Sequence, residues 1–158
     1  MQPTARLATI DDLPALVRLY RELEVEQTAL RPMWRLADGL AEPVGESLAG
    51  IVGSGDPLLY VGLVDGVTVG FVWATVDDLL PQAGGLQVGT VRLIFTEPPA
   101  RGVGVGEAMM AEVLGELRGR GVSMFDAKVS PGHRHAKNFF EAHGFSARLI
   151  VMHHDDAR

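Results

Sequence analysis

The chain has 158 residues, of which 47% are hydrophobic and 22% charged, and its formal net charge is −6. These values are ordinary for a soluble globular protein of one domain with a buried core, so we expect residues 1–158 to form a single domain. The acidic balance argues against a nucleic-acid partner, and no run approaches the roughly 20 apolar residues that a membrane span requires.

The first predicted elements are a short strand and a long amphipathic helix. Arg6–Ile10 has the composition of a strand, and Asp11 is expected to cap the helix that follows. That helix is predicted from Asp12 to about Thr28 because its apolar residues recur at helical spacing along one stripe. In the Pro- and Gly-rich interval 31–56, only Ser47–Val52 is predicted to be helical.

Three strands are predicted next as an antiparallel meander. Leu58–Val64 and Thr68–Val76 flank Asp65-Gly66-Val67, and an Asp-Gly pair between apolar runs is a strong hairpin signal. The third strand is Val91–Thr96, which ends at Pro98-Pro99 because proline cannot donate to a ladder.

The last part of the chain alternates helices and strands. An apolar stripe beginning at Met109 predicts a helix, and a strand over Val122–Val129 should lie parallel to the central strand because a helix connects the two. A helix over about His133–His143 and a strand over Phe145–His153 follow, and we expect a disordered tail at 155–158. The order β-α-α-β-β-β-α-β-α-β predicts an α/β (α+β) fold with a mixed, mostly antiparallel sheet flanked by helices.

A glycine-spaced loop, Arg101-Gly102-Val103-Gly104-Val105-Gly106, lies between the third of these meander strands and the Met109 helix. Glycines at a helix start let backbone N–H groups converge where the helix already has unpaired donors and a positive dipole end, which is a site for an anion. Arg101 adds a forked cation suited to phosphate. The third glycine of a dinucleotide fingerprint is replaced by Met109, and no lysine follows as in a P-loop. A merely flexible turn and a nucleotide-binding loop both remain as alternatives.

Two motifs carry a resemblance to a known family. R-x-x-G-x-G (Arg101, Gly104, Gly106) between a strand and a helix resembles motif A of the GNAT superfamily, the acyl-coenzyme-A-dependent N-acyltransferases. The stretch 127–145 resembles the family's motif B, with matches at Ala136, Phe140-Glu141 and Gly144-Phe145. The predicted order of elements is also that of the GNAT fold.

The resemblance implies acetyl-CoA as co-substrate. No metal is expected, because none of the five histidines sits in a His/Cys cluster with the spacing of a structural metal site. In the family the fourth and fifth strands part, and the pantetheine arm of the coenzyme pairs with the freed backbone groups. Carried onto this chain, the resemblance and the loop give these expected cofactor-binding residues: Phe95, Thr96, Glu97, Arg101, Gly102, Val103, Gly104, Val105, Gly106, Glu107, Ala108, His133 and Phe140. It also implies a mobile loop over the acceptor site, in the segment that holds Met33 and Trp34.

Three polar positions of the family are changed here. Its asparagine becomes His133, its glutamate base becomes Lys128, and its proton-donating tyrosine becomes Phe140, which cannot donate a proton. An amine acceptor must lose a proton before it attacks, so we consider Glu26 and His133 as catalytic bases. Glu26 could instead be a surface carboxylate, and His133 could make a hydrogen bond at the helix start. The oxyanion is expected at a central-strand amide, for which Thr96 N–H is the choice.

The predicted function is therefore an N-acetyltransferase that moves acetyl from acetyl-CoA directly to an amine, through a ternary complex. A catalytically silent acyl-CoA sensor or interaction domain is the alternative, because Phe140 and Lys128 depart from the family pattern. The acceptor stays open, and a homodimer is expected by analogy only. We expect a cytoplasmic location because the N-terminal residues lack the apolar core of a secretory signal.

Overall fold

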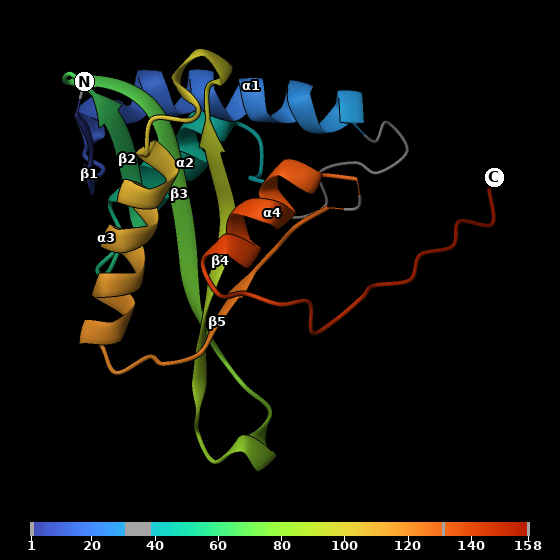
Figure 1. Ribbon diagram of the computed structural model, residues 1–158. Helices are drawn as coiled ribbons and strands as arrows, with labels where there is room; N and C mark the ends of the chain where they lie inside the picture. Colours follow the sequence, from blue (N-terminus) through green and yellow to red (C-terminus); the bar gives the residue numbers. More distant parts are fainter. Residues whose placement is uncertain (1, 31–38, 131, 158) are drawn as a thin grey trace.

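The computed structural model describes residues 2–30, 39–130 and 132–157, and it contains a five-stranded sheet in the order β1-β2-β3-β4-β5 (Figure 1). Neighbouring strands are antiparallel except for β4 and β5, which are parallel. The strands are β1 (Pro3–Leu7), β2 (Leu59–Val64), β3 (Val67–Asp78), β4 (Gln87–Thr96) and β5 (Phe125–Ala127). The helices are α1 (Leu13–Leu30), α2 (Val44–Val52), α3 (Val105–Gly119) and α4 (Arg134–Ala142). This mixed sheet with four helices confirms the predicted fold class.

Two apolar layers cover the two faces of the sheet. Side chains of α1 and α2 pack on one face, together with Phe71 and Phe95. Side chains of α3 and α4 pack on the other face, together with Val72 and Val91. Successive strand residues such as Phe71 and Val72 therefore belong to opposite cores, as the two-residue period of a strand requires.

The N-terminal strand and helix were both predicted, but the predicted end of the strand differs from the observed one. β1 ends at Leu7, before the expected Ile10, and Ile10–Asp12 forms a short 3-10 turn leading into α1. The carboxylate that receives the Thr9 N–H is that of Asp12 and not that of Asp11, at 2.8 Å. Asp12 can do so because Arg6 neutralises it through a two-bond ion pair of 2.8 and 3.0 Å, which compensates for its burial.

Two predictions for the C-terminal half were wrong. The strand expected over 122–129 is only Phe125–Ala127, and residues 145–153 form no strand at all. A strand is held by its neighbour, and β5 pairs with β4 over three residues only, while the 145–153 segment has no ladder partner among the described residues.

Met33 and Trp34 lie outside the described residues, so the loop over the acceptor site stays a prediction, as does the disordered tail. Among the helices in the described ranges, none has the length and apolar character needed to cross a membrane.

Candidate active site

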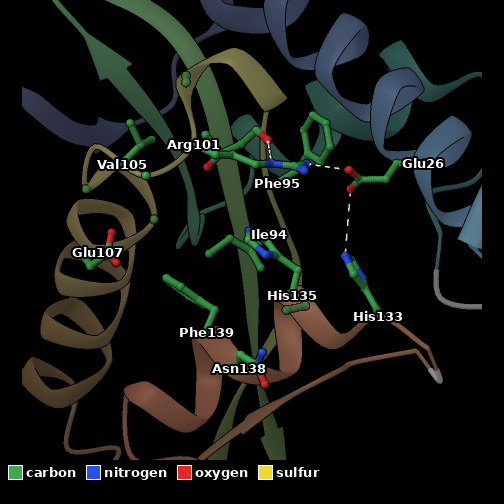
Figure 2. Close-up of a pocket in the computed structure, with 16 residues that line it drawn as sticks. Glu26, Ile94, Phe95, Arg101, Val105, Glu107, His133, His135, Asn138 and Phe139 are labelled. Atoms are coloured by element: carbon green, nitrogen blue, oxygen red, sulfur yellow. Dashed lines mark hydrogen bonds and ion pairs between the residues drawn. The ribbon is translucent and has the colours of Figure 1, made fainter.

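A cavity of about 520 Å³ opens between the end of β4, the start of α3 and one side of α4 (Figure 2). Glu26 of α1 also lines it. Ten of the predicted site residues line it: Glu26, Phe95, Thr96, Arg101, Gly102, Gly104, Val105, Gly106, Glu107 and His133.

The start of α3 presents free backbone donors to this cavity. Ala108 N–H is the first to bond back into the helix, reaching Gly104 O at 3.0 Å, so the N–H groups of Val105, Gly106 and Glu107 have no acceptor within the helix. No side chain of the described residues caps the helix at Gly104. Gly104 has φ +98°, a conformation that costs glycine nothing and other residues about 1–2 kcal/mol. The turn thus points three donors and the positive helix end at one place, which suits an anion.

Glycine is also required here by close packing. A Cβ atom on Gly106 would lie 2.8 Å from Cε1 of Phe139, so Gly106 lets α3 and α4 approach each other beside the cavity. A Cβ atom on Gly62 in β2 would lie 2.6 Å from Cγ1 of Val105. Gly62 therefore seats the first turn of α3 on the sheet, a role that no signal in the sequence indicated.

β4 and β5 separate where they reach the cavity. Their ladder covers Gly89 to Val91, and the Lys128 N–H bonded to Val91 O at 3.0 Å is the last link between them. β4 then continues to Thr96 with β3 beside it and with no second neighbouring strand in the described part of the chain. Glu97 N–H bonds to Val69 O of β3. In an antiparallel ladder, every second residue of a strand bonds to the same neighbouring strand. The backbone groups of Ile94 and Thr96 therefore face away from β3 and toward the cavity that these residues line.

Arg101 connects β4 to α1 across the cavity. Its Nε donates to Thr96 O at 2.8 Å, and its Nη2 lies 2.8 Å from Glu26 Oε1. The guanidinium carbon lies 5.4 Å from the centre of the Phe95 ring, in a cation–π geometry. Figure 2 shows this side chain directed toward Glu26, and away from Val105 and Glu107 at the start of α3. The cation expected at the phosphate site is thus engaged elsewhere in this structure.

His133 stands on the other side of Glu26. Its Nε2 lies 4.0 Å from Glu26 Oε2, and its side chain is 15% exposed. Burial lowers the pKa of His133 below its usual value, and the Arg101 charge lowers it further, whereas Glu26 acts in the opposite direction. The net shift favours the neutral imidazole at pH 7, the form that can accept a proton.

Four predicted cofactor residues lie outside the cavity lining. Glu97 pairs with Arg18 at 2.8 Å, and Phe140 is 4% exposed in the core of the α3 face. Val103 and Ala108 belong to the loop and the first turn but do not line the cavity. The contacts assigned to these residues stay predictions.

The prediction missed six lining residues, most of them on α4: Ile94, Ala100, His135, Ala136, Asn138 and Phe139. A signal for the α4 residues existed, because Ala136 and Phe139 are three positions apart and share one helix face.

The family model of the acetyltransferase (GNAT) family matches residues 13–145. The chain therefore belongs to the acetyltransferase (GNAT) family. It is 32% identical over 81 residues to the mycothiol acetyltransferase of Thermobispora bispora. That match covers 51% of this chain and 27% of the relative, so the chain spans about a quarter of this curated protein's length.

Solved structures share the fold over nearly the whole chain. A transcriptional regulator from Bacillus halodurans has a TM-score of 0.76 at 22% identity, covering 97% of this chain and 100% of that one. AAC(6')-Iy in complex with a CoA-containing bisubstrate analog has a TM-score of 0.72 at 19% identity, covering 99% of each chain. A predicted acetyltransferase with acetyl-CoA from Clostridium acetobutylicum has a TM-score of 0.70 at 14% identity, covering 98% of this chain and 96% of the other.

Proposed function

We propose that this chain is an N-acetyltransferase that transfers the acetyl group of acetyl-CoA to an amine by direct attack in a ternary complex. The observation that carries the proposal is that two features meet in one cavity: the free donors at the start of α3, and the backbone of β4 exposed where β5 leaves it. Family membership and structural neighbours that contain CoA or acetyl-CoA support it.

In this proposal, each feature receives a different part of the co-substrate. The pyrophosphate lies at the N–H groups of Val105, Gly106 and Glu107, where anions are favoured. The pantetheine amides pair with the backbone of Ile94 as an added strand would, because the Thr96 carbonyl already accepts a hydrogen bond from Arg101 Nε. The acetyl group then lies beyond Thr96, next to Glu26 and His133.

His133 serves as the base in this mechanism. Its neutral imidazole takes a proton from the acceptor ammonium, directly or through water, and the resulting imidazolium is stabilised by Glu26. The amine nitrogen then bonds to the thioester carbon, and the oxyanion that forms accepts a hydrogen bond from Thr96 N–H. When the C–S bond breaks, the electron pair leaves with sulfur, and the proton still carried by the new amide nitrogen passes through water to the departing thiolate. Thiols have a reference pKa of about 8.5, so the thiolate departs without the tyrosine that Phe140 replaces.

A steric block with a matched control tests co-substrate binding. Ala136 lines the cavity, whereas its neighbour Lys137 is 64% exposed and pairs with Glu141 on the outer face of α4. We expect Ala136→Trp to fill the cavity and weaken CoA binding at least about ten-fold in calorimetry, a loss of about 1.4 kcal/mol. Lys137→Trp should bind CoA within about two-fold of the parent. Equal affinity of the two variants would reject the cavity as the CoA site.

Transfer itself is measured by thiol release from acetyl-CoA over a panel of amines. Release that depends on an amine supports the enzyme, and the His133→Ala variant should lose about 10²–10⁴ in rate with CoA affinity retained. Tight CoA binding without release on any amine would instead favour the silent acyl-CoA sensor. Binding of ATP in preference to CoA would favour the nucleotide-binding alternative.

A further inference from the structure

The opening between β4 and β5 has a second side, on the sheet face that α1 and α2 cover in part. Val91 and Ala127 form the last ladder pair before the strands part, and both pack in the core on the α3 face. Because successive strand residues point to opposite faces, the next residue of each strand, Arg92 and Lys128, points away from α3. Two cations therefore lie on neighbouring strands, which are about 4.8 Å apart, at the place where the sheet opens.

Arg92 is held in place by side chains of β3. Its Nε donates to Thr75 Oγ1 at 2.9 Å, and its Nη2 lies 3.1 Å from Asp77 Oδ2. Ala74, the partner of Val91, packs on the α3 face, so Thr75 points to the opposite face, as Arg92 does. These contacts occupy one edge of the guanidinium, whose Nη1 has no partner among the described residues. Arg92 thus offers a fixed donor, with its side chain 26% exposed.

The ammonium of Lys128 is exposed, and the nearby carboxylate of Asp126 is already paired. Arg148 Nε donates to Asp126 Oδ1 at 2.8 Å. That hydrogen bond is the main cause of the lowered pKa of Asp126, and the charge of Lys128 adds a smaller effect in the same direction. With Arg92 and Asp77, the cluster holds three cations and two carboxylates. It carries one positive charge in excess, although the chain as a whole has a net charge of −6.

We propose that the acceptor is an amine that also carries a carboxylate, and that Arg92 and Lys128 bind this carboxylate. The inference rests on the acetyl transfer proposed above. Because the co-substrate fills the side of the opening toward α3 and α4, the acceptor approaches from the other face and passes these two cations. Both can donate charge-assisted hydrogen bonds to the oxygens of one carboxylate.

The position of the cations along β4 sets the size of this acceptor. Thr96, next to which the acetyl group lies, is four residues beyond Arg92, a distance of about 13 Å along the strand. An extended tripeptide spans about 10 Å between its amine and its carboxylate, and the long side chains of Arg92 and Lys128 cover the remainder. A single α-amino acid is too short. The substrate class is therefore a short peptide with a free amine and a free carboxylate.

Trialanine and its C-terminal amide test this proposal, because they differ only in the carboxylate. For the parent, kcat/KM measured by thiol release should be at least about ten-fold higher for trialanine. Lys128→Gln should reduce this preference at least about five-fold, and Lys128→Arg should keep it. The control is Lys137→Gln at the other lysine of the chain, which pairs with Glu141 on the outer face of α4 and should leave the preference unchanged. Equal use of the two peptides by the parent, or an undiminished preference in Lys128→Gln, would overturn the proposal.

A binding measurement separates failure of the carboxylate site from failure of acetyl transfer. N-acetyl-trialanine and its amide are titrated into the protein with CoA present, and binding is followed by NMR of the peptide, which requires no turnover. Tighter binding of the carboxylate form, lost in Lys128→Gln, supports the site even if no amine releases thiol, in which case acetyl transfer is refuted. Thiol release with both peptides at equal rates, together with equal binding, would leave acetyl transfer standing and refute the carboxylate site.

Discussion

Gly62→Ala is the sharpest available test of how the sheet positions the start of α3. The new Cβ would lie 2.6 Å from Val105 Cγ1 and 2.9 Å from Met109 Sδ, where ordinary contacts are 3.4–4 Å. Val105 and Met109 are 1% and 0% exposed, so neither side chain can swing into solvent. The first turn of α3 must therefore move away from β2.

The magnitude follows from the size of this overlap. Forcing one additional methyl into a well-packed core costs about 1–3 kcal/mol. For a domain of this size, each kcal/mol lowers the melting temperature by roughly 2–4 °C, so we expect a decrease of about 2–12 °C. The same movement displaces the Val105 N–H. A hydrogen bond to a charged group contributes about 1.5–3 kcal/mol, so its loss should weaken CoA binding at least about ten-fold.

Gly115→Ala is the matched control, because Gly115 lies in the same helix and nothing is within 4 Å of its Cβ position. A Gly→Ala change at an open helical position stabilises by about 0.5–1 kcal/mol. We expect a higher melting temperature in calorimetry with CoA affinity unchanged. If Gly62→Ala melts no lower than the parent, the close seating of α3 is refuted; if it melts lower but binds CoA as well as the parent, the first turn is not the phosphate site.

Three further outcomes follow from the ion pairs. Glu26 raises the pKa of His133, so Glu26→Gln lowers that pKa further and should move the acid limb of the pH–rate profile for acetyl transfer to lower pH. Arg101 lowers the same pKa, so Arg101→Ala should move the acid limb to higher pH; shifts in one direction for both variants would exclude His133 as the base. Asp12→Ala removes the ion pair with Arg6 and the hydrogen bond from Thr9, and should lower the free energy of unfolding by about 1–3 kcal/mol at pH 7 in urea titrations. The folded-state pKa of Asp12 is lowered chiefly by the Arg6 hydrogen bond, so this stability is present above the ordinary carboxyl pKa of about 3.9 and is lost as pH falls through the folded value. A difference between parent and Asp12→Ala that is as large at about pH 2 as at pH 7 would contradict the ion-pair explanation.

Local signals were sufficient for the elements that depend on local conformation. The β2–β3 hairpin was predictable because Asp65 and Gly66 adopt positive φ values, 51° and 80°, which few other residue pairs accept. The loop before α3 was predictable for the same reason, since Gly102 and Gly104 have φ values of 85° and 98°. In both places the residue type itself determines the backbone.

Pairing of strands could not be read from composition. The 145–153 segment has a strand sequence, but whether it forms a strand depends on finding an edge, and its own chain carries it away from one. The same limit applies to β5, which ends at Ala127, where its pairing with β4 stops at Val91. The sequence indicates that a segment can form a strand, but which strand it pairs with depends on the three-dimensional arrangement of the chain.

The candidate base shows a third kind of limit. Sequence reasoning proposed Glu26 and His133 separately, and it placed Arg101 at the phosphates because of its position in the glycine loop. The backbone N–H groups of the loop lie where the glycine spacing predicts, because the start of a helix determines the direction of its first N–H groups. A long arginine side chain has no such constraint, and here it follows the nearest carboxylate and the carbonyl of Thr96. Arg101 thereby joins the two candidates into one cluster, in which Arg101 lowers and Glu26 raises the pKa of His133, an arrangement that only the folded chain can reveal.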